Sequence, residues 1–148
     1  MTLTVRERIL ADLYAAIDAV PAVTAYRNRR KPVEAARLPA LVLTDGDHGE
    51  ADRSLTRAEM FELRVAIEGL VRDTTDAAIG PALNALYGQT VAAIMADPTR
   101  GGLAHDTIEQ GLAVDFDRGE GGQPVASFRL DVTVRYMTRP GDPYTVQG

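Results

Sequence analysis

Strict alternation of apolar and polar residues between positions 126 and 136 constrains the fold more than any other feature. Every second residue there is apolar, and each residue between them is polar. Successive side chains of a β-strand point to opposite faces of the sheet, so this pattern predicts a half-buried strand. We expect a core-facing set and an outward-facing set: Ala126, Phe128, Leu130, Val132, Val134 and Tyr136 inward, and Ser127, Arg129, Asp131, Thr133 and Arg135 outward.

Four further segments have the pattern or composition of strands. Residues 61–69 alternate in the same way, with Phe61, Leu63, Val65, Ile67 and Gly69 on one face and Glu62, Arg64, Ala66 and Glu68 on the other. The apolar segment ALVLT at 40–44 predicts a buried strand, and residues 23–27 predict a short one. After the segment ADPTRGG, Leu112, Val114 and Phe116 alternate with Ala113 and Asp115, which predicts a strand with one apolar face.

Two segments have helical periodicity. The first begins at the capping-box sequence TVRE, Thr4–Glu7, has apolar residues at helical spacing up to Val20, and should end at Pro21. The second should run from about Thr75 to Met95, with Thr74 or Thr75 as its N-cap.

The resulting order is helix, three strands, helix, two strands. Hairpin loops join most of these strands, so the sheet should be largely antiparallel. The fold class we expect is therefore α+β, with a single mostly antiparallel sheet and two helices packed on one face. Residues 1–148 form one domain in this interpretation, and residues 139–148 form an extended C-terminal tail that is free to lie on a neighbour. Pro140 and Pro143 should keep that tail out of a helix and out of a central strand.

Composition excludes several classes of protein. The net charge of −5 argues against specific nucleic-acid binding, which usually uses a basic face. No apolar run is long enough to span a membrane, and the first residues do not resemble a signal peptide. The absence of cysteine removes disulfides, thiolate metal sites and a cysteine nucleophile, and we expect a cytosolic setting.

Two segments raise the question of a chemical site. MADPTRGGLAHD at 95–106 has glycines after a helix and no nearby lysine, whereas a phosphate-binding loop precedes a helix and carries one. We interpret it as a corner in which Pro98 ends the helix and Gly101 and Gly102 give backbone freedom. DGDHGEAD at 45–52 is acidic, but Glu50 and Thr56 stand where a calcium loop needs glycine and glutamate. We expect no metal, no cofactor and no catalytic residue.

Several motifs resemble those of a known family when taken in order. They are the helix opening VRERILADL, the segment AYRNRRKPVEAARLPALVLTDGD, DPTRGGLAHD after the second helix, and the closing VRYMTRPGDPY. Together they cover nearly the whole chain, which resembles the tail terminator (tail completion, or minor tail) proteins of long-tailed bacteriophages and gene transfer agents.

The resemblance implies a structural protein without catalytic residues. It implies a homo-oligomeric ring, commonly a hexamer, that caps the tail tube and stops its polymerisation. The ring would also offer a head–tail joining surface to the head-completion or connector protein. Such a protein would assemble in the cytoplasm of the host bacterium and then form part of the phage or phage-like particle.

Three surface segments are the expected interfaces, because mobile charged loops on a rigid sheet usually carry recognition. They are the basic segment at 27–31, the hairpin tip at 45–54 and the tail at 139–148. The interface residues that we expect are Arg27, Arg29, Arg30, Lys31, Asp45, Asp47, His48, Glu50, Arg53, Arg139, Asp142 and Tyr144. The alternatives left open are a small cytosolic α+β enzyme or ligand-binding protein and a bacterial adaptor domain.

Overall fold

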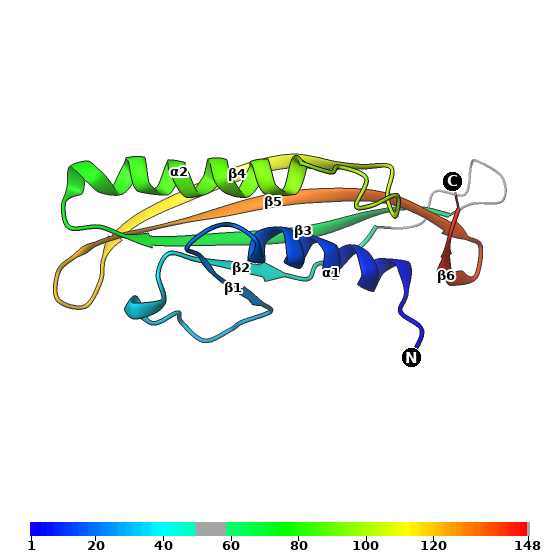
Figure 1. Cartoon of the computed structure of the whole chain (residues 1–148), viewed down its shortest axis with the longest axis horizontal. Helices are drawn as coiled ribbons and strands as arrows, with labels where there is room; N and C mark the ends of the chain where they lie inside the picture. Colours follow the sequence, from blue (N-terminus) through cyan, green and yellow to red (C-terminus); the bar gives the residue numbers. More distant parts are fainter. Residues whose placement is uncertain (50–58, 148) are drawn as a thin grey trace.

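The computed structural model describes residues 1–49 and 59–147. Two α-helices and six strands follow one another along the chain (Figure 1). They are α1 (Val5–Asp18), β1 (Thr24–Arg27), a 3-10 turn (Ala35–Arg37), β2 (Ala40–Thr44), β3 (Glu59–Arg72), α2 (Asp76–Met95), β4 (Asp106–Arg118), β5 (Pro124–Arg139) and β6 (Asp142–Val146). The expected α+β class is confirmed.

All six strands belong to one mixed sheet. Its order is β1-β2-β3-β5-β4, and β6 pairs with the end of β5. Only the β1–β2 pair is parallel among the described pairings, so the expectation of a mostly antiparallel sheet holds with that one exception. The long strands β3, β4 and β5 run side by side along the whole molecule, whereas β1 and β2 are short (Figure 1).

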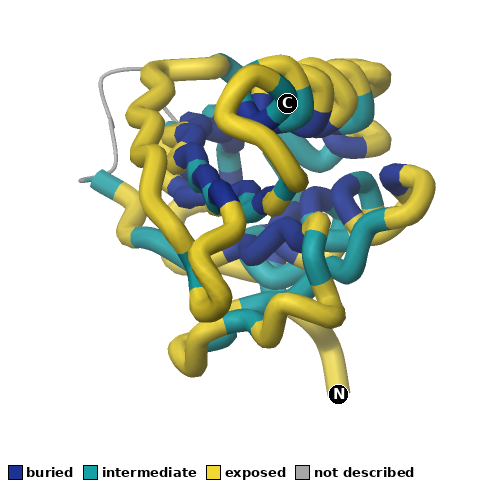
Figure 2. The backbone as a smooth tube through the Cα atoms, turned by 90° about the vertical axis from the view of Figure 1, so that its left-hand side faces the viewer, coloured by how far each residue is buried: buried dark blue, intermediate teal, exposed yellow. Residues whose placement is uncertain are grey.

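Both helices lie on the same face of this sheet. α2 packs on β3 and β5, while α1 packs on β1 and β2 and touches α2 (Figure 1). The inward residues of β3 and β5 join the apolar stripes of both helices in one cluster, and the buried part of the chain lies between the two layers (Figure 2). All six residues expected to face inward on β5 are buried, which confirms the register of that strand.

Local signals set the helix starts. The Thr4 hydroxyl accepts a hydrogen bond from the Glu7 amide at 3.0 Å, and Thr75 does the same for Ala78 at 3.2 Å. The other half of the expected capping box differs, because the Glu7 carboxylate accepts hydrogen bonds from Arg27 instead. α1 ends at Asp18, slightly before Pro21.

The C-terminal residues correct one expectation. They were predicted to extend freely from the domain, but residues 142–146 turn back as β6 and pair with β5. Arg8 on α1 donates a hydrogen bond to the Tyr144 carbonyl at 3.0 Å, which holds the strand against the helix layer. Pro143 is tolerated there because β6 is short and lies at the sheet margin.

The largest difference between the structure and the sequence pattern is the exposure of the apolar face of β4. Leu112, Val114 and Phe116 are 41%, 52% and 54% exposed. They lie opposite Leu130, Phe128 and Ala126 of β5, which are buried, so their side chains share the helix-covered face of the sheet. Because α2 sits over β3 and β5, it leaves this outer strand largely uncovered.

Candidate functional site

Arg27, the first residue of the expected basic interface, is held within the chain. Its guanidinium donates two hydrogen bonds to the Glu7 carboxylate, both at 2.8 Å, and two to Asp45 at 3.0 and 2.9 Å. These bonds raise the pKa of Arg27 and lower the pKa of both carboxyl groups. The cluster links α1 to the ends of β1 and β2, so Arg27 and Asp45 have a structural role within the subunit.

The remaining cations of this loop differ in accessibility. Arg29 stacks on the Tyr26 ring at 4.4 Å and pairs with Glu34 at 3.2 Å. Arg30 and Lys31 are exposed, as is Arg37 in the following 3-10 turn. We call residues 28–38 the basic loop, and it lies beside β1 at one edge of the sheet.

Part of the expected hairpin tip packs on the end of the sheet. The imidazole of His48 lies 4.5 Å from the Phe61 ring, centroid to centroid, and its Nδ1 is 3.1 Å from the Tyr136 hydroxyl. Partial burial lowers the pKa of His48, and the neighbouring Arg6 lowers it further. Asp47 is exposed beside this cluster. Glu50 and Arg53 lie outside the described residues.

The expected tail residues lie at the opposite end of β5 from its turn with β4. Arg139, the last residue of β5, is exposed. The Asp142 carboxylate accepts a hydrogen bond from the Tyr144 amide at 3.0 Å, and the Tyr144 side chain is exposed. The fold therefore presents these residues on a short strand rather than on a loose end.

The corner after α2 is organised by Arg100, which the sequence interpretation did not single out as structural. This residue is 2% exposed, and its guanidinium donates hydrogen bonds to the carbonyl groups of Ile94 and Asp97. Its Nη1 lies 3.3 Å from Asp12 of α1. A cation at the carbonyl end of a helix is electrostatically favourable, so Arg100 caps α2 and joins it to α1.

Left-handed backbone completes the corner. Arg100, Gly101 and Gly102 have φ angles of 52°, 69° and 88°, which is the conformation that glycine tolerates without strain. The expected role of the two glycines at this position is confirmed. Asp97 accepts hydrogen bonds from Thr99 and Gly101, so the segment satisfies its own polar groups.

The exposed apolar residues Leu112, Val114 and Phe116, which we call the β4 row, form the most distinctive surface. Among the described strands, β4 pairs only with β5, so its other side is a thirteen-residue open sheet edge. An open edge offers unpaired backbone N–H and C=O groups to another chain. Clustered exposed apolar residues beside such an edge mark a protein–protein contact more often than isolated ones do.

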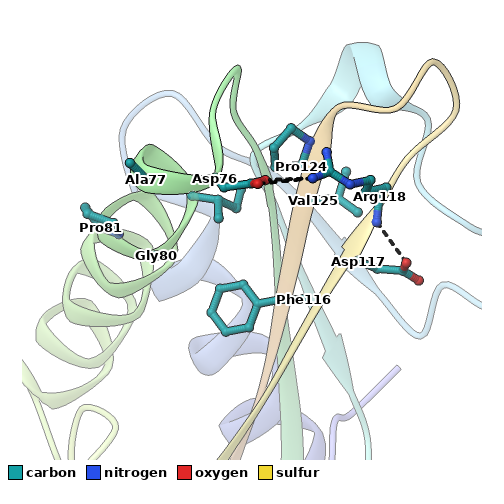
Figure 3. A pocket seen from close by; sticks show the side chains of 10 residues that line it. Asp76, Ala77, Gly80, Pro81, Phe116, Asp117, Arg118, Pro124 and Val125 are labelled. Atoms are coloured by element: carbon teal, nitrogen blue, oxygen red, sulfur yellow. Dashed lines mark hydrogen bonds and ion pairs between the residues drawn. The ribbon is translucent and has the colours of Figure 1, made fainter.

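A hollow lies at the end of this surface, between β4 and the start of α2. Its volume is about 390 Å³, and the Phe116 ring points into it from β4 towards Gly80 and Pro81 (Figure 3). Arg118 closes one side through an ion pair with Asp76 at 3.1 Å. Farther along, the Tyr87 hydroxyl of α2 donates a hydrogen bond to Glu109 of β4. Along β4, Leu112, Val114 and Phe116 lie between these two bridges.

The opposite face of the sheet is polar, as expected. Glu62, Arg64, Glu68, Arg129 and Asp131 are exposed, and Arg135 is half-buried. This face is hollowed, with a volume of about 600 Å³, and the hollow is lined by Glu62, Arg64, Glu68, Arg129 and Asp131 together with residues 44–47 and neighbouring strand residues. Arg129 pairs with Asp131 at 3.1 Å and Arg135 with Asp106 at 2.7 Å, so many of its charges neutralise one another.

Neither hollow assembles a recognisable reaction centre. In the residues that the structure describes, no cluster of three or more histidine, aspartate or glutamate side chains could hold a metal ion. No described helix is long and apolar enough to cross a membrane.

Comparisons with known proteins give a distant structural likeness. No family model matches the chain, and no curated protein matches it. Among solved structures, the chain is similar to one described as "Virion of native gene transfer agent (GTA) particle", at 15% identity and a TM-score of 0.33. The similarity covers 91% of this chain and 92% of that one.

Proposed function

We propose that this protein is a tail terminator: a structural protein that forms a ring at the end of a phage or phage-like tail tube, stops tube growth and presents the surface for head joining. The sequence motifs that resemble those of tail terminators support the assignment of this protein to the end of a tail tube. The uncovered β4 row on an open sheet edge is the observation that carries self-assembly.

An isolated copy would leave the apolar β4 row exposed to water. Three large apolar side chains are roughly half exposed on one strand. Covering the exposed part of each would contribute roughly half of the 1.5–3 kcal/mol that complete burial of such a side chain provides. Soluble proteins usually shorten, twist or charge an edge strand of this kind. A neighbouring subunit would cover both the row and the open edge.

In such a ring, the two ends of the long strands would remain available for other proteins. The rigid three-strand body of β3, β5 and β4 would form the wall of each subunit, and its ends would present different segments. The His48 cluster and β6 lie at one end of β5, and the β4–β5 turn lies at the other. We propose that the expected interface residues at the first end, Asp47, His48, Arg139, Asp142 and Tyr144, contact the tube protein or the connector.

Tube growth in vitro tests this function. Tail tube protein is polymerised with and without the purified chain carrying a gold label, and the tubes are imaged by electron microscopy. The proposal predicts label at tube ends and tubes that stop growing once capped. Label scattered along tube walls, or tube lengths unaffected by saturating protein, would overturn the tail terminator assignment.

A further inference from the structure

The two edges of the sheet carry opposite charge. On the β4 side, Asp115, Asp117 and Glu120 are exposed, with Arg118 as the nearby cation. On the β1 side, the basic loop exposes Arg30, Lys31 and Arg37, while its carboxylate Glu34 is paired with Arg29. Because β1 and β4 are the outermost strands of the sheet, these charges lie at opposite sides of one subunit.

The basic loop also offers apolar contact area. Pro32, Ala35 and Ala36 are exposed, and Val33 is half-buried. On β4 the row lies on the helix-covered face of the sheet, and Asp115 and Asp117, at the alternate positions, lie on the other face. A loop that wraps around this open edge can therefore place small apolar residues on the row and its cations beside the two carboxylates.

Contact of β4 with β4 of a second copy is disfavoured by the same charges. A two-fold pairing would bring the carboxylates of Asp115 and Asp117 close to those of the second copy, and like charges across an interface cost binding energy. Contact between the β4 edge and the basic loop pairs opposite charges. Such a head-to-tail contact joins two different patches and is repeated from copy to copy, so it closes into a ring when the rotation allows.

We infer that the basic loop of each subunit wraps around the β4 edge of the next subunit. Residues 32–36 then pack on the β4 row on one face of the strand, and Arg30 and Lys31 face Asp115 and Asp117 on the other. This inference rests on the proposed ring and names the surfaces that close it. It also gives the predicted basic patch an acidic partner, which is a second copy of this chain.

Charge reversal on each side separately tests the contact. The loop variant R30E/K31E and the edge variant D115R/D117R are compared with charge-preserving controls, R30K/K31R and D115E/D117E. Native mass spectrometry gives the oligomeric state, and circular dichroism checks folding. Each reversed variant should lose the closed oligomer, both controls should keep it, and an equimolar mixture of the two reversed variants should recover it, because each then meets an opposite charge.

The outcomes separate this inference from the function on which it rests. If wild-type protein forms a closed oligomer and R30E/K31E forms it equally well, the loop is not in the interface and the inference fails while the ring survives. If wild-type protein is monomeric at all concentrations, the proposed ring and the inference both fail. Recovery in the mixture would distinguish head-to-tail contact from a general loss of folding.

Discussion

Val114 of β4 lies directly opposite Phe128 of β5, yet Val114 is 52% exposed and Phe128 is 1% exposed. The two side chains lie on the same face of the sheet and on neighbouring strands, yet one is exposed and the other is buried. α2 covers Phe128, whose ring meets the Tyr87 ring edge-on at 6.1 Å, and it does not reach over Val114. The apolar face of the sheet is therefore wider than the helix layer that covers it.

Substitution of Val114 by lysine should break the assembly without unfolding the subunit. The side chain is exposed in the single copy, so the free energy of unfolding should change by less than about 1 kcal/mol, while a buried charge would be forced on the proposed interface. Analytical ultracentrifugation measures the assembly and chemical denaturation the stability. Gln89→Lys, at an exposed position of α2 outside the β4 edge, is the control and should leave assembly intact.

Phe128 and Phe116 should respond differently to truncation. Phe128→Ala creates a cavity in the core and should lower the free energy of unfolding by about 3–5 kcal/mol. Phe116→Ala should cost much less in the isolated subunit because its ring is already half exposed. Urea denaturation of dissociated subunits compares the two. Equal losses would mean that β4 is as well covered as β5.

Arg100 should be required as a guanidinium and not only as a positive charge. Arg100→Ala leaves the Ile94 and Asp97 carbonyl groups without their donor and should lower the free energy of unfolding by about 1–3 kcal/mol. Arg100→Lys should recover only part of that loss, because an ammonium group cannot reproduce the planar fork. Thermal denaturation ranks the variants. A lysine variant as stable as wild type would contradict this role.

The Arg27 cluster should make stability depend on pH in the acid range. The pKa values of Glu7 and Asp45 are lowered in the folded protein, mainly by hydrogen bonds from Arg27, relative to ordinary values of 4.5 and 3.8. The unfolded chain therefore binds more protons in this range, so the stabilisation is fully present well above pH 4.5 and is lost as the pH falls through the folded pKa values.

The variant Arg27→Met isolates that contribution. It should be less stable than wild type at pH 7, and its free energy of unfolding should decline less between pH 5 and pH 3. Denaturation curves across this range give the comparison. Parallel curves for the two proteins would show that the cluster does not set the acid sensitivity.

The sequence predicted the elements and faces well because each depends on local pattern. The alternation in residues 126–136 specified the β5 register, and Thr4 and Thr75 marked the two helix starts. These signals are read from neighbours along the chain. The same alternation placed Leu112, Val114 and Phe116 on the apolar face but could not predict their exposure, which depends on how far α2 extends across the sheet.

Local sequence pattern could not predict which side chains from distant elements pair with one another. Arg27 belongs to a run of basic residues, but only the fold brings Glu7 and Asp45 to it from other elements. Arg100 similarly stands in a glycine-rich turn, and its burial depends on α1 and the end of α2 meeting there. The prediction of a free tail was also wrong, because the turn at 140–141 reverses the chain and lets residues 142–146 pair with β5.

Native mass spectrometry of the wild-type chain, beside Val114→Lys, tests the central claim most directly. The account predicts one closed species of about six copies for the wild type, as expected for a ring, and folded monomer for the variant. A wild-type chain that remains monomeric while folded, or a variant that assembles as well as wild type, would contradict assembly through the β4 edge.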